Sequence, residues 1–259
     1  MLFALAGNSL SGAANPAPLP AQPFSPYLVT PAAKSNYTGV FIQGSATDGT
    51  NLYIATSGDL SKCARDYWTG DTLAYNPTPF HGLQGYNHLG DPACADGKLY
   101  CPMEYYDQGA SSNASIGIFK TSDLSRLSVT LITNILSEVS SICIVPGQRT
   151  LFVSDYLAGR IVALDLDTFK FKNEVPLQKK LPLIQGIEWF QNRLYASAGF
   201  PGSLYCINPV TGEVDLALDY RCGANENEGL MVVSNFLVAN FAFTNRTSTN
   251  YYFRSRPPQ

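Results

Sequence analysis

The residues best suited to chemistry in this chain are two histidines and a few carboxylates. His81 and His88 are the only histidines, and His88 lies three residues before Asp91 at the start of a predicted strand. A histidine beside a carboxylate can act as a general base with an orienting partner, or both can ligate a metal. The candidate catalytic residues are His88, Asp91 and Glu188. The alternative is a hydrogen-bonded structural pair, because structural ion pairs use the same groups as active sites.

A second set is defined by position, since a polar residue stands at or near the start of each of five similar segments. These residues are Gln43, Asp91, Glu138, Glu188 and Glu228. If the segments surround a common axis, their carboxylates repel one another unless a cation or a proton lies among them. Hard oxygen ligands suit calcium, and we expect Asp91, Glu188 and Glu228 as its ligands. The alternative is that some of these side chains face water and others point to loops.

Aromatic side chains are the third candidate group. Several tyrosines and a tryptophan fall in predicted loops without recurring at a fixed spacing, and such residues can stack on a ligand such as a sugar. These candidates are Tyr67, Trp68, Tyr105 and Tyr106. Other aromatics recur at one position of each segment, which favours packing between neighbouring structural units.

Five copies of one hairpin pattern must position these residues. Each copy has a short apolar strand, a tight turn and a second strand that begins with a large apolar pair. Aligned on that pair, the copies are marked by Tyr53, Tyr100, Phe152, Tyr195 and Leu237. They recur every 40 to 50 residues or so, a period typical of propellers. Asp96-Gly97 is the clearest turn, because both residues tolerate the positive φ of a type I′ hairpin.

Further strands follow the hairpins, so each unit is a four-stranded meander. The sequence therefore predicts an all-β, five-bladed β-propeller; a six-bladed propeller and a β-sandwich are the alternatives. The last unit, which ends with a predicted strand over 251–254, has no fourth strand. We expect residues 24–30 to close the ring there. The turn also sets Cys94 opposite Leu99, so a disulfide between Cys94 and Cys101 is not expected.

Composition excludes several classes of protein. Only 14% of the 259 residues are charged and the net charge is −3, so the chain has no overall electrostatic attraction for nucleic acid or for an anionic membrane. No apolar run is long enough for a membrane span. Residues 1–23 read as a signal-like or extended segment, and residues 24–259 as one propeller domain.

The compartment is predicted from sequons and cysteines. Asn36, Asn113 and Asn245 begin N-glycosylation sequons, and the six cysteines are an even number. We expect a protein that is secreted or lies in the lumen of the secretory pathway. The alternatives are chance sequons and buried free thiols.

Two blades carry a family resemblance. Residues 153–165, VSDYLAGRIVALD, resemble the blade signature of the SMP-30/gluconolactonase-like and NHL propellers, and residues 185–214 resemble a blade of the five-bladed plant-type glutaminyl cyclases. The resemblance implies a propeller. In the cyclases a glutamate on the second strand of an early blade shuttles protons, whereas residues 53–58 here, YIATSG, hold no carboxylate. In the gluconolactonase-like family calcium lies on the axis, and Glu188 is a candidate ligand for it.

Two functions follow from these observations. One is a secreted propeller that presents a mouth at the central channel to a small molecule, a glycan or a protein. The other is a cation-dependent hydrolase of the lactonase or esterase type, or a cyclase-like enzyme, that uses the axial carboxylates. No Gly-x-Ser-x-Gly elbow, Gly-rich phosphate loop or His-Glu-x-x-His motif is present, which favours binding.

Overall fold

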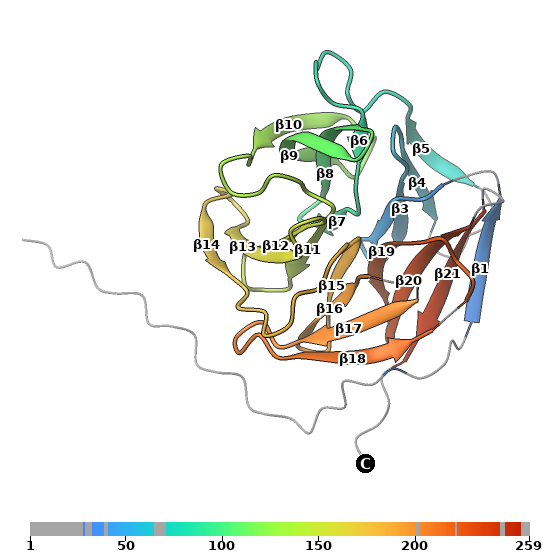
Figure 1. Cartoon of the computed structure of the whole chain (residues 1–259). Helices are drawn as coiled ribbons and strands as arrows, with labels where there is room; N and C mark the ends of the chain where they lie inside the picture. The colour runs from blue at the N-terminus through green and yellow to red at the C-terminus, as the bar shows by residue number, and fades with distance from the viewer. Residues whose placement is uncertain are drawn as a thin grey trace, which may run out of the picture.

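Five small antiparallel sheets surround one axis (Figure 1). The computed structural model describes residue 28, the backbone of residues 33–38, and residues 41–64, 71–199, 202–220, 222–243 and 247–254. All regular elements in these ranges are strands. The five-bladed propeller predicted from the hairpin period is confirmed.

The strands of blades one to four run outward from the axis in chain order, and blade five does the same except that its outermost strand is β1. Blade one contains β2 (Gly44–Thr47), β3 (Asn51–Ala55), β4 (Leu60–Ala64) and β5 (Thr72–Asn76). Blade two contains β6 (His88–Leu89), β7 (Ala93–Ala95), β8 (Lys98–Asp107), β9 (Ala110–Lys120) and β10 (Arg126–Leu131). Blade three contains β11 (Ser141–Val145), β12 (Thr150–Asp155), β13 (Arg160–Asp165) and β14 (Phe171–Glu174).

The last two blades complete the ring. Blade four contains β15 (Gly186–Phe190), β16 (Arg193–Ser197), β17 (Ser203–Ile207) and β18 (Val214–Asp219). Blade five contains β19 (Glu226–Val233), β20 (Phe236–Phe243), β21 (Thr247–Phe253) and β1 (Ala33–Thr38).

The β7–β8 turn shows how local chemistry fixes register. Asp96 and Gly97 have φ of 51° and 69°, as a type I′ turn requires. Cys94 consequently lies opposite Leu99, as predicted. Cys94 and Cys101 are free thiols, so the expectation that they do not pair is confirmed.

The core lies between blades, where the faces of adjacent sheets meet. Phe152 and Ile161 of blade three, for example, pack with Ile187 and Leu194 of blade four. Tyr195, one of the recurring aromatics, is fully buried. Large side chains at the repeat period therefore fill the gaps between blades, which leaves the ends of the inner strands for function.

The ring is closed by a different segment from the one predicted. β1 pairs along its whole length with β21, so the outer strand of blade five is residues 33–38. Of residues 24–30 only Leu28 is described, and its N–H donates to the carbonyl of Ala217 in blade four. The prediction failed because it looked for apolar residues, whereas an outer strand requires mainly backbone hydrogen bonds along one edge.

Candidate functional site

The carboxylate of Asp91 ties the five blades together on the axis. Its Oδ1 accepts the N–H of Ser45 at 3.1 Å, and its Oδ2 accepts the N–H of Leu230 at 3.0 Å and the hydroxyl of Ser141 at 2.8 Å. The Ser141 hydroxyl in turn accepts the N–H of Ile187 at 2.9 Å. Asp91 belongs to blade two, so this network reaches the inner strands of all the others.

Asp91 is completely buried and closely surrounded. Burial raises the pKa of its carboxyl group, while the three donors oppose that rise because they stabilise the ionised form. A Cβ added to Gly44 or Gly229 would lie 2.3 or 2.1 Å from Asp91 atoms. Glycine at these positions therefore lets two inner strands approach the carboxylate, and Asp91 fills the axis as a structural group.

A cluster of carboxylates lies at the end of the ring where the inner strands begin. We call this end the acidic mouth and define it by Gln43, His88, Glu104, Glu138, Asp155, Tyr156, Glu226 and Glu228. Four of its carboxylates, on Glu104, Glu138, Asp155 and Glu228, belong to residues that are at most 5% exposed. Within the described residues, the only ion pair that these carboxylates make is between Glu104 and His88.

His88 joins two blades at the acidic mouth. Its Nδ1 lies 3.1 Å from Oε1 of Glu104, and its Nε2 lies 3.0 Å from Oε1 of Gln43. The second oxygen of Glu104 accepts the N–H of Val139 at 3.3 Å. Both ring nitrogens thus face oxygen atoms, and the histidine is held by a carboxylate other than Asp91, its predicted partner.

Blade three contributes two further carboxylates. Glu138 accepts the N–H of Leu157 at 3.3 Å, and Asp155 accepts the N–H of Ala158 at 2.9 Å and the hydroxyl of Ser137 at 3.2 Å. Burial, together with the negative charge of Glu104, raises the pKa of Glu138 to about 7. Glu138 is therefore poised to gain or lose a proton near neutral pH.

Glu228 is the exception within the cluster. It is 1% exposed, and no described residue donates a hydrogen bond to its carboxylate oxygens. Burial raises its pKa well above the ordinary value, and so do the charge of exposed Glu226 and a hydrogen bond between the two carboxyl groups when Glu228 is protonated. A buried polar group without a partner is costly, so its retention requires an explanation.

The structure does not bring together the three predicted calcium ligands. The Asp91 carboxylate is occupied by protein donors, and Glu228 lies at the acidic mouth. Glu188 lies within β15, where its Oε1 accepts the N–H of Trp189 at 2.7 Å. Burial raises the pKa of Glu188 to about 8. Among the described residues no group of three His, Cys, Asp or Glu side chains is arranged to hold a metal ion. Calcium on this set stays a prediction.

One of the predicted aromatic residues, Tyr106, lies on the rim of the acidic mouth. Tyr105 and Tyr106 lie near the end of the long strand β8 and are 40% and 44% exposed. The Tyr106 ring centroid is 5.6 Å from that of His88, and Asn87 exchanges two hydrogen bonds with the Tyr106 backbone. Tyr67 and Trp68 lie outside the described residues.

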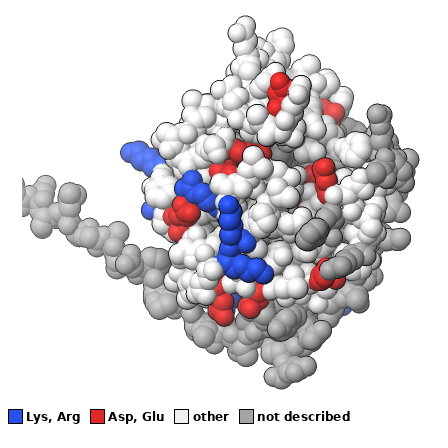
Figure 2. Space-filling view, in the orientation of Figure 1, with Lys and Arg blue, Asp and Glu red and all other residues white. Residues whose placement is uncertain are grey.

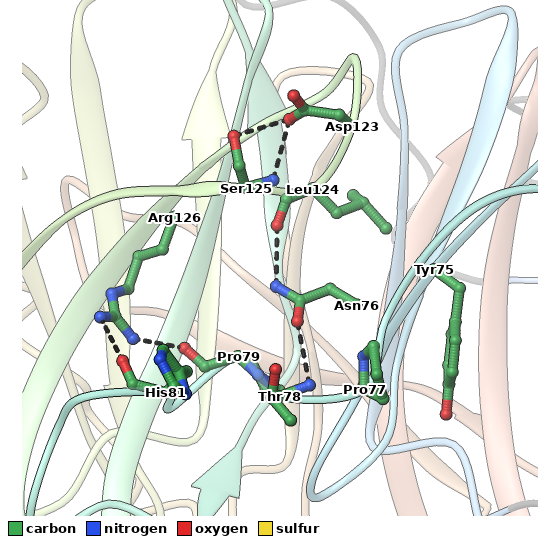
Figure 3. Close-up of a pocket in the computed structure, with 10 residues that line it drawn as sticks. All are labelled: Tyr75, Asn76, Pro77, Thr78, Pro79, His81, Asp123, Leu124, Ser125 and Arg126. Carbon is green, nitrogen blue, oxygen red and sulfur yellow. Dashed lines mark hydrogen bonds between the residues drawn. The ribbon is translucent and has the colours of Figure 1, made fainter.

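The second histidine lies elsewhere. His81 lines a hollow of about 380 Å³ between β5 and the turn before β10 (Figure 3). Arg126 donates to the carbonyls of Pro79 and His81, and Asn76 donates to the carbonyl of Leu124. The polar groups of this hollow thus mostly hold its own walls together.

Charges on the face seen in Figure 2 are unevenly spread. The Lys and Arg side chains gather in one stretch, over the region where Figure 1 shows β13 to β16, with carboxylates beside them. Elsewhere on this face the acidic groups are scattered among uncharged residues.

The sequons occupy different environments. The Asn113 side chain donates to the carbonyl of Gly85 at 2.8 Å, and Asn36 lies in β1. Asn245 is outside the described residues. Glycosylation at the three positions stays a prediction, as does the secretory location. No described helix is long and apolar enough to span a membrane.

Sequence reasoning missed Glu104 and Asp155. Both lie at or near the far end of their strands, β8 and β12, whereas the candidate carboxylates were taken from strand starts. The signal for Glu104 was a single charged residue after the apolar run Leu99–Met103. A carboxylate in a buried strand requires a partner, and here that partner is His88.

Comparison with solved structures supports the fold. Glutaminyl cyclase of Myxococcus xanthus has a TM-score of 0.66 and 14% identity, and the match covers 87% of this chain and 96% of the enzyme. A luciferin-regenerating enzyme matches at a TM-score of 0.56 and 12% identity, over 84% of this chain and 78% of its own. These likenesses show the fold. The predicted resemblance to propellers, including a glutaminyl cyclase, is thereby confirmed.

A third propeller, from a nidogen/laminin complex, matches at a TM-score of 0.54 and 15% identity, over 78% of this chain and 73% of that one. No protein-family model matches the chain, and no curated protein matches it by sequence. The neighbours thus include enzymes and a protein in a complex, which leaves function to the geometry of the site.

Proposed function

We propose that this propeller binds a small organic ligand with a positive charge at the acidic mouth. The observation that carries the proposal is Glu228, a buried carboxyl group to which no described residue donates a hydrogen bond. It lies in a cluster where His88 is the one basic side chain of the described residues that pairs with a carboxylate. A bound cation would supply the missing opposite charge.

Binding should be coupled to proton release. Because the pKa of Glu228 is raised, the carboxyl group holds a proton in the free protein at pH values where an ordinary glutamate is ionised. A cation at the acidic mouth favours the ionised form, so the proton leaves as the ligand binds. The affinity for a permanent cation should therefore increase with pH.

Calorimetric titration with small probes tests this proposal. Ethanolamine and choline should bind with released protons, whereas neutral ethylene glycol should not. Glu228→Gln should weaken binding about tenfold or more, since a charge interaction of about 1.4 kcal/mol corresponds to that factor. Glu213→Gln, which alters an exposed carboxylate directly before the outer strand β18, is the matched control. Absence of binding by either cation, or binding unaffected by Glu228→Gln, would overturn the proposal.

A second candidate function is proton-transfer catalysis at the same mouth. Glu138, with a pKa of about 7, has the property that general acid–base catalysis favours. The similar structure of a glutaminyl cyclase supports this candidate through fold alone. Turnover of lactones and of peptides with N-terminal glutamine by the wild type and by Glu138→Gln tests it. Activity with a pH profile that Glu138→Gln abolishes would establish an enzyme, and no turnover on either substrate would remove this candidate.

A further inference from the structure

We infer that the charged group bound at the acidic mouth is an alkylated ammonium, of the kind that choline carries. This inference rests on the proposed function and names its ligand class. Two independent observations lead to it: the hydrogen-bonding state of the carboxylates, and the tyrosine rings beside them.

The carboxylates of the acidic mouth are poorly suited to bind N–H groups. Glu104, Glu138 and Asp155 already accept hydrogen bonds from protein donors. Glu228 is free of such bonds among the described residues, but its oxygens are buried below exposed Glu226. A primary ammonium group carries three N–H donors and requires acceptors for them once it leaves water. A quaternary ammonium carries none, and it responds to buried negative charge at a distance.

Tyrosine rings supply the complementary surface. Tyr106 is 44% exposed, and its backbone is fixed by the two hydrogen bonds with Asn87. Tyr156 is half-buried at the start of the turn after β12. Burial raises the pKa of Tyr156, as do the nearby charges of Glu226 and Glu138. The Tyr106 ring centroid lies 5.6 Å from that of His88, whose Nδ1 is 3.1 Å from Oε1 of Glu104, so Tyr106 also borders these carboxylates.

Aromatic faces and negative charge together are the features that attract alkylated ammonium groups. The N-methyl groups carry the positive charge over an apolar surface that packs on a ring, and such cation–π contacts contribute about 0.5–2 kcal/mol. Tyr106 offers an accessible ring, and the buried carboxylates beneath the rim supply the field.

Choline and ethanolamine test the inference because they differ only in three methyl groups. In calorimetric titrations of the full chain, choline should bind about tenfold more tightly than ethanolamine, in line with about 1.4 kcal/mol of added cation–π and apolar contact. Tyr106→Leu should remove this preference, and Tyr106→Phe should keep it. Tyr75→Leu, at an exposed tyrosine on the outer strand β5, is the control. Thermal unfolding of each variant reports whether it folds. If Tyr106→Leu does not fold, Tyr156→Leu is the second variant.

The outcomes separate this inference from the proposed function. If ethanolamine binds as tightly as choline and depends on Glu228, the proposed function stands and the inference is wrong. If choline binds more tightly but neither tyrosine variant alters the preference, the assignment of Tyr106 and Tyr156 to the ligand site is wrong. If neither cation binds, both proposals fail together.

Discussion

Asp91 and Glu228 are both buried carboxyl groups, yet their surroundings are opposite. Asp91 receives three hydrogen bonds from three different blades, whereas Glu228 receives none from the described residues. Burial raises the pKa of both. The difference indicates that Asp91, with its donors in place, serves the fold, and it is the basis on which a ligand is proposed at Glu228.

The largest effect is expected when the donors of Asp91 lose their acceptor. Asp91→Ala leaves the N–H groups of Ser45 and Leu230 and the Ser141 hydroxyl without a partner. Each unsatisfied buried group costs about 1–3 kcal/mol, so the free energy of unfolding should fall by about 4 kcal/mol or more. Chemical denaturation measures this value. A loss below about 1 kcal/mol would show that Asp91 does not join the blades.

A methyl group placed against the same carboxylate should have a smaller effect. In Gly229→Ala the new Cβ would lie 2.1 Å from Asp91 Oδ1 and 2.7 Å from the Cα of Gly44. Overpacking of this kind costs about 1–3 kcal/mol. Gly58→Ala, whose Cβ would meet nothing within 4 Å, is the matched control for denaturation experiments. Equal stability of the two variants would contradict tight packing at the axis.

The acidic mouth should make stability depend on pH. The pKa of Glu138 is about 7 in the folded protein and 4.5 ordinarily, so the folded state binds its proton more tightly. The contribution of this proton to the free energy of unfolding is fully present below the ordinary pKa and is lost as the pH rises towards about 7. At roughly 1.4 kcal/mol for each pKa unit, Glu138→Gln should remove about 2–3 kcal/mol of this decline. Parallel pH profiles for wild type and variant would contradict the shift.

The smallest effect on stability is expected at Glu228, with the opposite sign from Asp91. Glu228→Gln removes a group that cannot ionise without cost, so the free energy of unfolding at pH 8 should stay equal or rise by about 1 kcal/mol. Asp91→Asn, the same chemical change, should lower it. Denaturation of both variants in one buffer makes the comparison. Destabilisation of similar size by both would show that Glu228 is also a structural acid.

Local signals predicted the fold well. The Asp96-Gly97 turn fixed the β7–β8 register, and the recurrence of Tyr53, Tyr100 and their counterparts predicted five blades, because turn chemistry and packing repeat within each unit. Closure was predicted at the wrong segment, since an outer strand such as β1 has no strong apolar pattern.

The site was predicted less completely because it depends on contacts between distant blades. His88, Glu138 and Glu228 were identified from strand starts, and the structure places them at the acidic mouth. The roles of Asp91 and Glu104 follow from neighbours that are far away in sequence, such as Leu230 for Asp91 and Val139 for Glu104. No local pattern reveals such partners, and only the closed ring brings them into contact.

The pairing of β1 with β21 has a consequence for how the chain folds during synthesis. β1 leaves the ribosome before the strands of blades one to four, and its partner β21 follows all of them. Blade five therefore cannot be completed until the rest of the ring is in place. Until then β1 has an unpaired edge, so the nascent protein is open to association with other chains until β21 is made, and a chaperone would protect it over that whole period.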